Sequence, residues 1–375
     1  MNKIEFGDNR ETMKKWAEDG VKVQMCVTSP PYYGLRDYGT AEYEGGDQNC
    51  EHTISGYSDN LKPDCDRPER DGAKRKACIK CGAVRKDAQL GLEETPEEYI
   101  ENMVDVFRHV REILADDGVL WVNIGDSYYN YRPGKGQAMP QQTVSNNKQD
   151  LPDEVGRRGN KLDGLKEKDL MGIPWMLAFA LRADGWYLRQ DIIWHKPNPM
   201  PESVKDRCTK AHEYVFLLSK KPKYYYNDEA IKEPAKTPPT VRNKHAEGYQ
   251  ADYAKGDRFS AGERVYGADG KAKKRSVWSV NVKPYKGAHF AVYPIELIEP
   301  CILAGSKPGD IVFDPFMGSG TTAQAAIRHG RQYLGCELNP EYGALQQERI
   351  ALEQIGANPN LFEVQHTDVP PSTEE

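Results

Sequence analysis

The chain has 375 residues, 29% of them charged and 38% hydrophobic, a composition typical of a globular protein with one large or two modest domains. No apolar run reaches the length of a membrane span and the first residues hold no signal-peptide core, so we expect a cytoplasmic protein without a membrane partner. The net charge of −6 conceals a segment from Lys220 to Arg275 with a net charge of +6, so the acidic total does not exclude a nucleic-acid partner.

The first strong motif follows a buried strand. A short strand at 4–6 ends in Gly7-Asp8-Asn9, and alternating apolar residues at 21–27 predict the buried strand, directly before Thr28-Ser29-Pro30-Pro31-Tyr32. Two consecutive prolines cannot continue a strand or a helix, so we expect a rigid loop at the strand's carboxyl end, where open α/β sheets bind ligands. A hydroxyl, unpaired carbonyls and an aromatic ring suit a flat ring with an exocyclic amine. The alternative is an ordinary proline-rich turn.

Residues 36–89 lose this apolar periodicity and are predicted to be an insertion. Cys50-Glu51-His52 and Cys78-Ile79-Lys80-Cys81 offer four ligands, and a Cys-x-x-Cys-Gly sequence suits a zinc knuckle. Zinc would also order an insertion that has no hydrophobic core. We therefore predict a structural zinc ion on Cys50, His52, Cys78 and Cys81. Cys65 in place of His52 stays open, as does an unliganded insertion with incidental thiols.

Regular structure returns after the insertion. Thr95-Pro96-Glu97-Glu98 is a capping box that starts a helix, which we expect to end at Gly118 before a strand at 119–124. A helix at 174–183 and strands at 191–195 and 213–219 follow. Alternating helices and strands predict an α/β sheet.

A second motif lies nearly three hundred residues after the first. A buried strand at 311–313 leads into Asp314-Pro315-Phe316-Met317-Gly318-Ser319-Gly320-Thr321-Thr322 and a helix to about His329. This geometry directs free backbone N–H groups at an anionic ligand. The next strand ends in Glu337, where an acid can bind both hydroxyls of a ribose. A Gly-Lys-Ser/Thr phosphate loop and a full Gly-x-Gly-x-x-Gly are both absent from the sequence.

Together, Ser-Pro-Pro-Tyr and Asp-Pro-Phe-x-Gly-Ser-Gly-Thr-Thr resemble the motifs of the β-group S-adenosylmethionine-dependent DNA amino-methyltransferases, in which the catalytic motif precedes the cofactor motif. The resemblance covers roughly 1–35, 90–130, 170–225 and 277–345. It implies a Rossmann-like methyltransferase sheet, mixed and mostly parallel, with a circularly permuted motif order. A zinc-knuckle-like insertion and an irregular target-recognition region complete the expected fold.

The resemblance also implies a division of the chain and roles for individual residues. The expected regions are the catalytic half at 1–35 and 90–221, the insertion at 36–89, the target-recognition region at 222–276, the cofactor-binding half at 277–345 and an acidic C-terminal tail at 346–375. The expected catalytic residues are Ser29, Pro30, Pro31 and Tyr32, and the segment from Arg207 to Glu213 is expected beside the flipped base. The expected cofactor-binding residues are Asp8, Asn9, Thr28, His289, Phe290, Tyr293, Pro294, Asp314, Pro315, Phe316, Gly318, Ser319, Gly320, Thr321, Thr322 and Glu337.

The implied reaction is methyl transfer from S-adenosylmethionine to the N4 amine of a cytosine flipped out of double-stranded DNA. In this family Ser at the position of Ser29 usually accompanies cytosine N4, and Asp or Asn accompanies adenine N6, which is the alternative. Attack at ring carbon five would need a nucleophilic cysteine, but Pro300-Cys301 lies in an apolar helical stretch, so we assign Cys301 to the core.

Three questions stay open. Relatives that methylate RNA or a protein glutamine usually carry Asn-Pro-Pro-Tyr after the cofactor motif, which makes both substrates remoter alternatives. A catalytically inactive, zinc-containing DNA-binding protein is an alternative of another class. Double-stranded DNA is the implied partner, and the sequence does not decide whether a second copy of the chain or a cognate restriction nuclease is another.

Overall fold

The computed structural model describes most of the chain outside the insertion and the long polar segments. The described residues are 1–34, 40, 42–47, 49–51, 78, 80–86, 88–129, 131–132, 136–137, 162, 164–235, 240–242, 264–266, 270–283 and 293–357.

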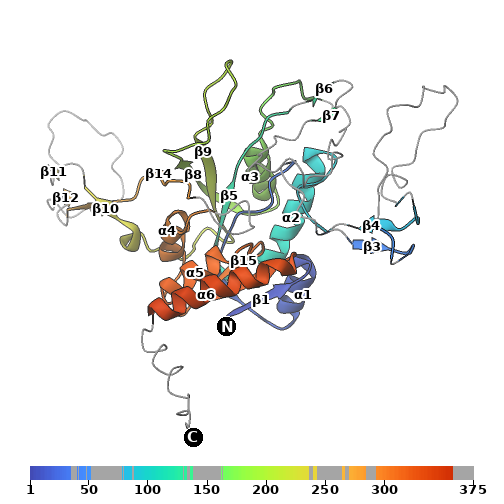
Figure 1. Cartoon of the computed structure of the whole chain (residues 1–375). Helices are drawn as coiled ribbons and strands as arrows, with labels where there is room; N and C mark the ends of the chain where they lie inside the picture. The colour runs from blue at the N-terminus through green and yellow to red at the C-terminus, as the bar shows by residue number, and fades with distance from the viewer. Residues whose placement is uncertain are drawn as a thin grey trace, which may run out of the picture.

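An eight-stranded sheet runs through the centre of the molecule in the order β1-β16-β15-β2-β5-β9-β8-β14 (Figure 1). Strand β9 pairs antiparallel to both of its neighbours, and all other pairs in the sheet are parallel. The sheet is therefore mixed and mostly parallel, as predicted. Its strands are β1 (Lys3–Phe6), β2 (Val23–Thr28), β5 (Leu114–Ile124), β8 (Tyr187–His195), β9 (His212–Ser219), β14 (Val277–Ser279), β15 (Ile311–Asp314) and β16 (Gln332–Glu337).

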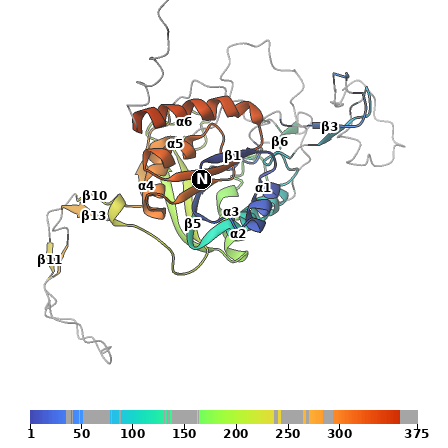
Figure 2. The ribbon, with the colours of Figure 1, turned by 90° about the horizontal axis from the view of Figure 1, so that it is seen from below.

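Helices cover both faces of the sheet, so its central strands are buried on both sides. Figure 2 shows α4, α5 and α6 on one side and α1, α2 and α3 on the other. Each face has its own apolar cluster, the first including Met103 and Leu177 and the second including Leu297 and Ile302. The helices are α1 (Asn9–Glu18), α2 (Pro96–Ile113), α3 (Ile173–Ala183), α4 (Ile295–Gly305), α5 (Thr321–Arg328) and α6 (Gly343–Ala357).

Short strands and 3-10 helices lie outside the main sheet and its helices. Among the described residues, two-stranded ladders pair β3 with β4, β6 with β7, β10 with β13 and β11 with β12. Their bounds are β3 (Glu42–Glu44), β4 (Val84–Lys86), β6 (Tyr131–Arg132), β7 (Gly136–Gln137), β10 (Glu233–Pro234), β11 (Thr240–Arg242), β12 (Arg264–Tyr266) and β13 (Lys271–Ala272), and short 3-10 helices are η2 (Glu229–Ile231) and η3 (Pro340–Tyr342). None of the helices within the described ranges has the length and apolar character needed to cross a lipid bilayer.

Two predicted boundaries differ from the structure. The helix expected to run to Gly118 ends at Ile113, and β5 begins at Leu114, whose backbone is extended. A bulge then brings Val119 opposite Met25 of β2. Gly118 lies inside this bulged strand, where a Cβ atom would stand 2.6 Å from Cγ of Leu114. The glycine therefore permits close packing in a strand and does not cap a helix.

The segment predicted as an acidic tail begins inside a packed helix. Residues 346–357 belong to α6, which lies against α5. Glu353 accepts hydrogen bonds from Gln324 and Arg328 on α5, and Gln346 donates to the carbonyl of Gly318. Polar side chains of this stretch thus serve helix packing, and the boundary predicted at residue 346 falls too early.

Candidate active site

The two sequence motifs meet at one edge of the sheet. Strands β2 and β15 are parallel neighbours, so their carboxyl ends lie side by side. Thr28 ends β2 and Asp314 ends β15, and the Thr28 hydroxyl donates a 2.6 Å hydrogen bond to Oδ1 of Asp314. Both side chains are fully buried. Residues 286 positions apart in the sequence are therefore joined directly at the point where each motif begins.

Asp314 is the centre of this junction. Besides Thr28, its carboxylate accepts hydrogen bonds from the hydroxyls of Thr322 and Tyr293 and from the backbone N–H of Phe316, at 2.5 to 3.0 Å. Burial raises the pKa of Asp314, and the four donors offset only part of this rise. Tyr293 lies just before α4, so one carboxylate fixes three segments around the end of β15.

The glycine-rich turn is connected to the acid on the next strand. Gly318 and Gly320 have positive φ angles of 54° and 87°, which favour glycine. The backbone N–H of Gly318 donates to Oε2 of Glu337 at 2.7 Å, and that of Asn339 donates to Oε1 at 2.8 Å. Burial raises the pKa of Glu337 to about 7. A buried acid that titrates near neutrality thus lies directly beside the turn.

The residues after β1 also reach this region. The Gly7 N–H donates to the Glu337 carbonyl, and the Asn9 side chain donates to the Pro315 carbonyl at 3.1 Å. The Asp8 carboxylate caps helix α1 and forms an ion pair with Arg10 at 2.6 Å. Asp8 therefore has local partners, and of these two residues Asn9 is the one whose side chain contacts the turn after β15.

The Ser-Pro-Pro-Tyr loop is held by side chains of α2 and β9. The Tyr99 hydroxyl of α2 donates to the Pro31 carbonyl at 2.9 Å. The Tyr32 hydroxyl lies 3.4 Å from Oγ of Ser29 and donates to Oε2 of Glu213 at 2.8 Å. Burial and the nearby Glu213 carboxylate raise the pKa of Tyr32 well above its usual value, so its hydroxyl stays protonated. Ser29 itself is half-buried at the edge of this cluster.

Two side chains of this cluster, Lys196 and Asn123, were not among the predicted site residues, and a third, Glu213, ends the segment expected beside the flipped base. Glu213 at the start of β9 also forms an ion pair with Lys196, which follows β8. Asn123 near the end of β5 donates to Glu213 and to the Tyr214 carbonyl at 3.3 and 3.1 Å. An asparagine inside the apolar run 119–124 was the signal that could have revealed it, because a buried amide needs dedicated partners. Lys196 carries no such signal, since charged residues at strand ends are common.

Three of the four predicted metal ligands lie within the described residues, and these three come together. Each Sγ atom of Cys50, Cys78 and Cys81 lies within 4.8 Å of the other two. The backbone folds tightly here: the Gly82 N–H donates to the Cys78 carbonyl at 2.8 Å, and the Cys78 N–H donates to the Ala83 carbonyl at 2.7 Å. The other candidate ligands, His52 and Cys65, lie outside the described residues, and so do the predicted cofactor residues His289 and Phe290.

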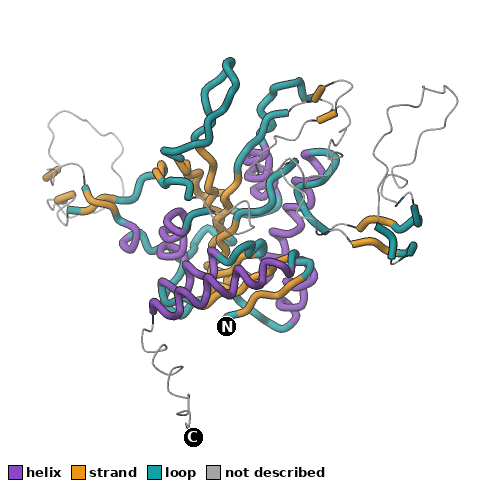
Figure 3. The backbone as a smooth tube through the Cα atoms, viewed as in Figure 1, coloured by secondary structure: helices purple, strands orange, loops and turns teal. Residues whose placement is uncertain are grey.

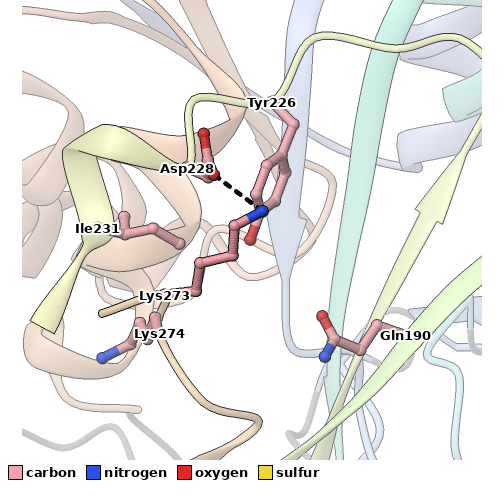
Figure 4. A pocket seen from close by; sticks show the side chains of 6 residues that line it. All are labelled: Gln190, Tyr226, Asp228, Ile231, Lys273 and Lys274. Atoms are coloured by element: carbon pink, nitrogen blue, oxygen red, sulfur yellow. Dashed lines mark ion pairs between the residues drawn. The ribbon is translucent and has the colours of Figure 1, made fainter. Parts of the chain in front are cut away.

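Two other features lie away from this site. Cys301 is buried in α4, 1% exposed, and burial raises its pKa strongly, so it is a core residue as predicted and not a nucleophile. A pocket of about 440 Å³ opens beside the middle of β8 (Figure 4), where Lys273 pairs with Asp228 at 3.3 Å. None of the motif residues lines this pocket, whose walls are Gln190, Tyr226, Asp228, Ile231, Lys273 and Lys274.

Comparison with known proteins decides the family. A family model described as DNA methylase, covering the N6 and N4 enzymes, matches residues 23–348. The chain belongs to the DNA methylase family. It is 41% identical over 356 residues to the Type II methyltransferase M.SmaI of Serratia marcescens, covering 93% of this chain and 90% of that protein. It is 40% identical over 328 residues to M.Cfr9I of Citrobacter freundii, covering 88% and 81%.

Solved structures share the fold of this DNA methylase. The PvuII DNA methyltransferase, described as cytosine-N4-specific, has a TM-score of 0.52 at 15% identity and covers 93% of this chain and 86% of its own. TTHA0409 of Thermus thermophilus, in complex with S-adenosyl-L-methionine, has a TM-score of 0.50 at 20% identity and covers 94% of both chains. The predicted family and the predicted mixed, mostly parallel α/β methyltransferase sheet are thus confirmed: the chain is a DNA methyltransferase of the β-group amino-methyltransferases.

Proposed function

We propose that this DNA methylase transfers a methyl group from S-adenosylmethionine to the N4 amine of a cytosine flipped out of duplex DNA. The hydrogen bond between Thr28 and Asp314 supports the proposal most, because it fastens the start of the Ser-Pro-Pro-Tyr loop to the start of the glycine-rich turn. A methyl donor bound at the turn and an amine bound at the loop would be neighbours. The cofactor would supply an electrophilic methyl group on a sulfonium.

We assign cofactor binding to the ends of β15 and β16. Glu337 would accept hydrogen bonds from the ribose hydroxyls, and Gly318 and Gly320 let the ligand approach the backbone closely. The Asp314 carboxylate already accepts four hydrogen bonds from the chain. We therefore assign Asp314 the role of holding Thr28, Tyr293 and the turn around the methionine end.

We assign the chemistry to the loop. Oγ of Ser29 and the carbonyl of Pro30 would accept the two amine hydrogens, which draws the nitrogen lone pair out of conjugation and aims it at the methyl group. Tyr32 would stack on the base, with its ring orientation fixed by the bond to Glu213. As the new N–C bond forms, the bond between the methyl group and the sulfonium sulfur would break, its electron pair would stay on the sulfur of the departing thioether product, and the amine would release one proton to water. Positioning is the main catalytic contribution, and no covalent enzyme intermediate is needed.

The choice of cytosine rests on Ser29. The same site with adenine N6 as the acceptor is the second candidate, because the loop, the cofactor residues and the transfer geometry would be unchanged. The basic region 222–276 is our proposed reader of the bases that flank the target.

The test is to incubate the protein with unmethylated DNA and S-adenosylmethionine and to analyse the digested nucleosides by mass spectrometry. We expect N4-methylcytosine. Detection of N6-methyladenine would show that adenine is the methyl acceptor, and the assignment as a DNA methyltransferase would still hold. Failure to bind S-adenosylmethionine in calorimetry would contradict the whole proposal and favour a catalytically inactive DNA-binding protein. Sequencing of the methylated DNA gives the recognition sequence.

We also propose that Cys50, Cys78 and Cys81 bind a structural zinc ion. Three thiols within 4.8 Å of one another suit zinc, which prefers sulfur and nitrogen ligands in a tetrahedron. The 3.9 Å between the sulfurs of Cys50 and Cys78 is far longer than a disulfide bond of about 2.05 Å. His52 is our proposed fourth ligand, with Cys65 as the alternative.

Metal analysis of the purified protein tests the zinc site. We expect about one zinc ion per chain. His52→Ala and Cys65→Ala form a matched pair, since only the substitution that removes a ligand should lower the zinc content. A folded wild-type protein without metal would contradict the proposal.

A further inference from the structure

The loop between β8 and β9, residues 196–211, projects from the catalytic edge of the sheet. Strands β8 and β9 are antiparallel, with His195 opposite His212, so their connection lies at one edge. Ile124, which ends β5, is opposite Tyr214 at the same edge. Figures 1 and 3 show the loop rising well above the strands. We call residues 196–211 the β8–β9 loop.

The β8–β9 loop is braced at several points. The Asn198 side chain exchanges two hydrogen bonds of 2.9 Å with the backbone of Val282. Asp206 forms an ion pair with Lys168 at 2.7 Å, and the guanidinium of Arg207 lies 3.8 Å from the centre of the Tyr128 ring. Prolines at positions 197, 199 and 201 stiffen the outgoing arm. The loop is thus built as a fixed projection.

The projecting part of this loop exposes apolar side chains. Met200 is 66% exposed and Val204 is 42% exposed. A single exposed apolar residue is ordinary on a protein surface. Here two lie on one braced loop, followed by the exposed Lys205, and no described element covers them.

The base of the loop connects to the catalytic cluster. Lys196, the first residue of the loop, pairs with Glu213, which holds the Tyr32 hydroxyl. At the other end, Lys210 donates to the Asp126 carbonyl at 2.9 Å, just beyond β5. A molecule that binds to the tip of the β8–β9 loop is therefore held in a fixed position relative to the Ser-Pro-Pro-Tyr loop.

We propose that the β8–β9 loop enters the DNA beside the target base and that Met200 fills the space this base leaves. This inference rests on the proposed base flipping. Removing a base from the stack costs about a few kcal/mol, and apolar side chains inserted between bases are a known means of stabilising opened DNA. Val204 would widen the apolar contact, and Lys205 would face the phosphates of the adjacent strand.

The test compares Met200→Ala with wild type on two duplexes that contain the recognition sequence. One duplex is fully paired, and the other has an abasic site opposite the target base, which leaves the target unpaired. We expect Met200→Ala to methylate the paired duplex at least tenfold more slowly and the abasic duplex within threefold of wild type. Its dissociation constant for S-adenosylmethionine should stay within twofold.

Leu352→Ala is the matched control, because Leu352 is an apolar side chain of similar exposure, 61%, on α6. It should match wild type on both duplexes. Wild-type rates for Met200→Ala on the paired duplex, or an equal loss on both duplexes, would overturn the proposed insertion of Met200. If wild type itself methylates neither duplex, the proposed function has failed, and the failure is then not specific to Met200.

Discussion

At the scale of single residues, substitutions of Ser29 and Glu337 should affect different steps: Ser29 the methyl transfer and Glu337 the binding of the cofactor. We predict that Ser29→Ala lowers kcat by about 10²-fold, because one of the acceptors for the reacting amine is lost. The dissociation constant for S-adenosylmethionine should stay within twofold, since the Ser29 hydroxyl has Tyr32 and not the glycine-rich turn as its neighbour. Calorimetry with single-turnover kinetics measures both quantities. Equal losses of affinity and turnover would contradict the role of Ser29.

Glu337 should make cofactor binding depend on pH. Its pKa of about 7 means that the free protein holds the carboxyl mostly protonated at pH 6 and mostly ionised at pH 8. Ribose hydroxyls favour the ionised acceptor, so the affinity for S-adenosylmethionine should rise by up to about tenfold from pH 6 to pH 8. Glu337→Gln should bind more weakly and without this pH dependence. A wild-type affinity that does not change between the two pH values would refute the prediction.

The same raised pKa affects stability with the opposite sign. The folded-state pKa of Glu337 exceeds the ordinary value of 4.5 because the carboxyl is buried. Its contribution to the free energy of unfolding is therefore complete below about pH 4.5 and is lost as the pH rises through 7. As the pH rises through 7, the affinity for the cofactor should therefore increase while the stability of the free protein decreases.

Thr28 has a structural role that its substitution should expose. Thr28→Val keeps the side-chain shape but leaves Oδ1 of the buried Asp314 with one donor fewer. The free energy of unfolding in urea should fall by about 1–3 kcal/mol. Thr28→Ser retains the hydroxyl and is the control, with a smaller loss. If Thr28→Val loses no more than Thr28→Ser, the hydrogen bond does not stabilise the junction.

The site could be predicted from the sequence only in part. Ser29 follows the buried strand β2 and Glu337 ends the buried strand β16, and short polar motifs at the ends of such strands can be recognised in the sequence. Lys196 was missed, and Glu213 was expected beside the base but not as the partner of Tyr32, because both reach the site only through the pairing of β5 with β9 and of β9 with β8. That pairing joins segments that are distant in the sequence, so no local sequence pattern predicts it.

At the scale of elements, the ends of the cysteine insertion pack against the Ser-Pro-Pro-Tyr loop. The Gly34 N–H donates to the Gly91 carbonyl at 2.8 Å, so the two ends of the insertion meet. A Cβ atom on Gly91 would stand 2.9 Å from the carbonyl oxygen of Tyr32. The backbone that closes the insertion therefore packs directly against the carbonyl of Tyr32.

Removal of the metal should test the role of this contact. We predict that Cys81→Ser, which deletes one proposed zinc ligand, lowers the zinc content and reduces kcat severalfold. The affinity for S-adenosylmethionine should be unaffected, because the proposed cofactor-binding residues Gly318, Gly320 and Glu337 lie at the ends of β15 and β16. Lys80→Ala is the control, because it changes an exposed side chain of the same turn and keeps every ligand. Full activity in a zinc-free Cys81→Ser protein would show that the insertion does not support the catalytic loop.

Helices and strands could be predicted where apolar residues recur at a regular helical or strand spacing. The helix that starts at Thr95 has its predicted cap, with the Thr95 hydroxyl accepting from the Glu98 N–H at 3.1 Å. Its end was predicted too late, because Gly118 has the residue type of a helix stop but the environment of a tightly packed strand. Close packing against Leu114 cannot be seen until the neighbouring strand is known.

At the scale of the whole molecule, the order of the motifs along the chain governs when the enzyme can form during synthesis. Asp314 lies 286 residues after Thr28, and β2 pairs directly with β15. Synthesis adds about 5–20 residues per second, so the edge of β2 that pairs with β15 stays unpaired for tens of seconds before β15 has been made. A nascent or prematurely ended chain would have the Ser-Pro-Pro-Tyr loop, with β2 paired to β5, but would lack β15 and the glycine-rich turn. Methylation should therefore begin only when synthesis is nearly complete, and truncated products should be inactive and prone to aggregate through the open edge.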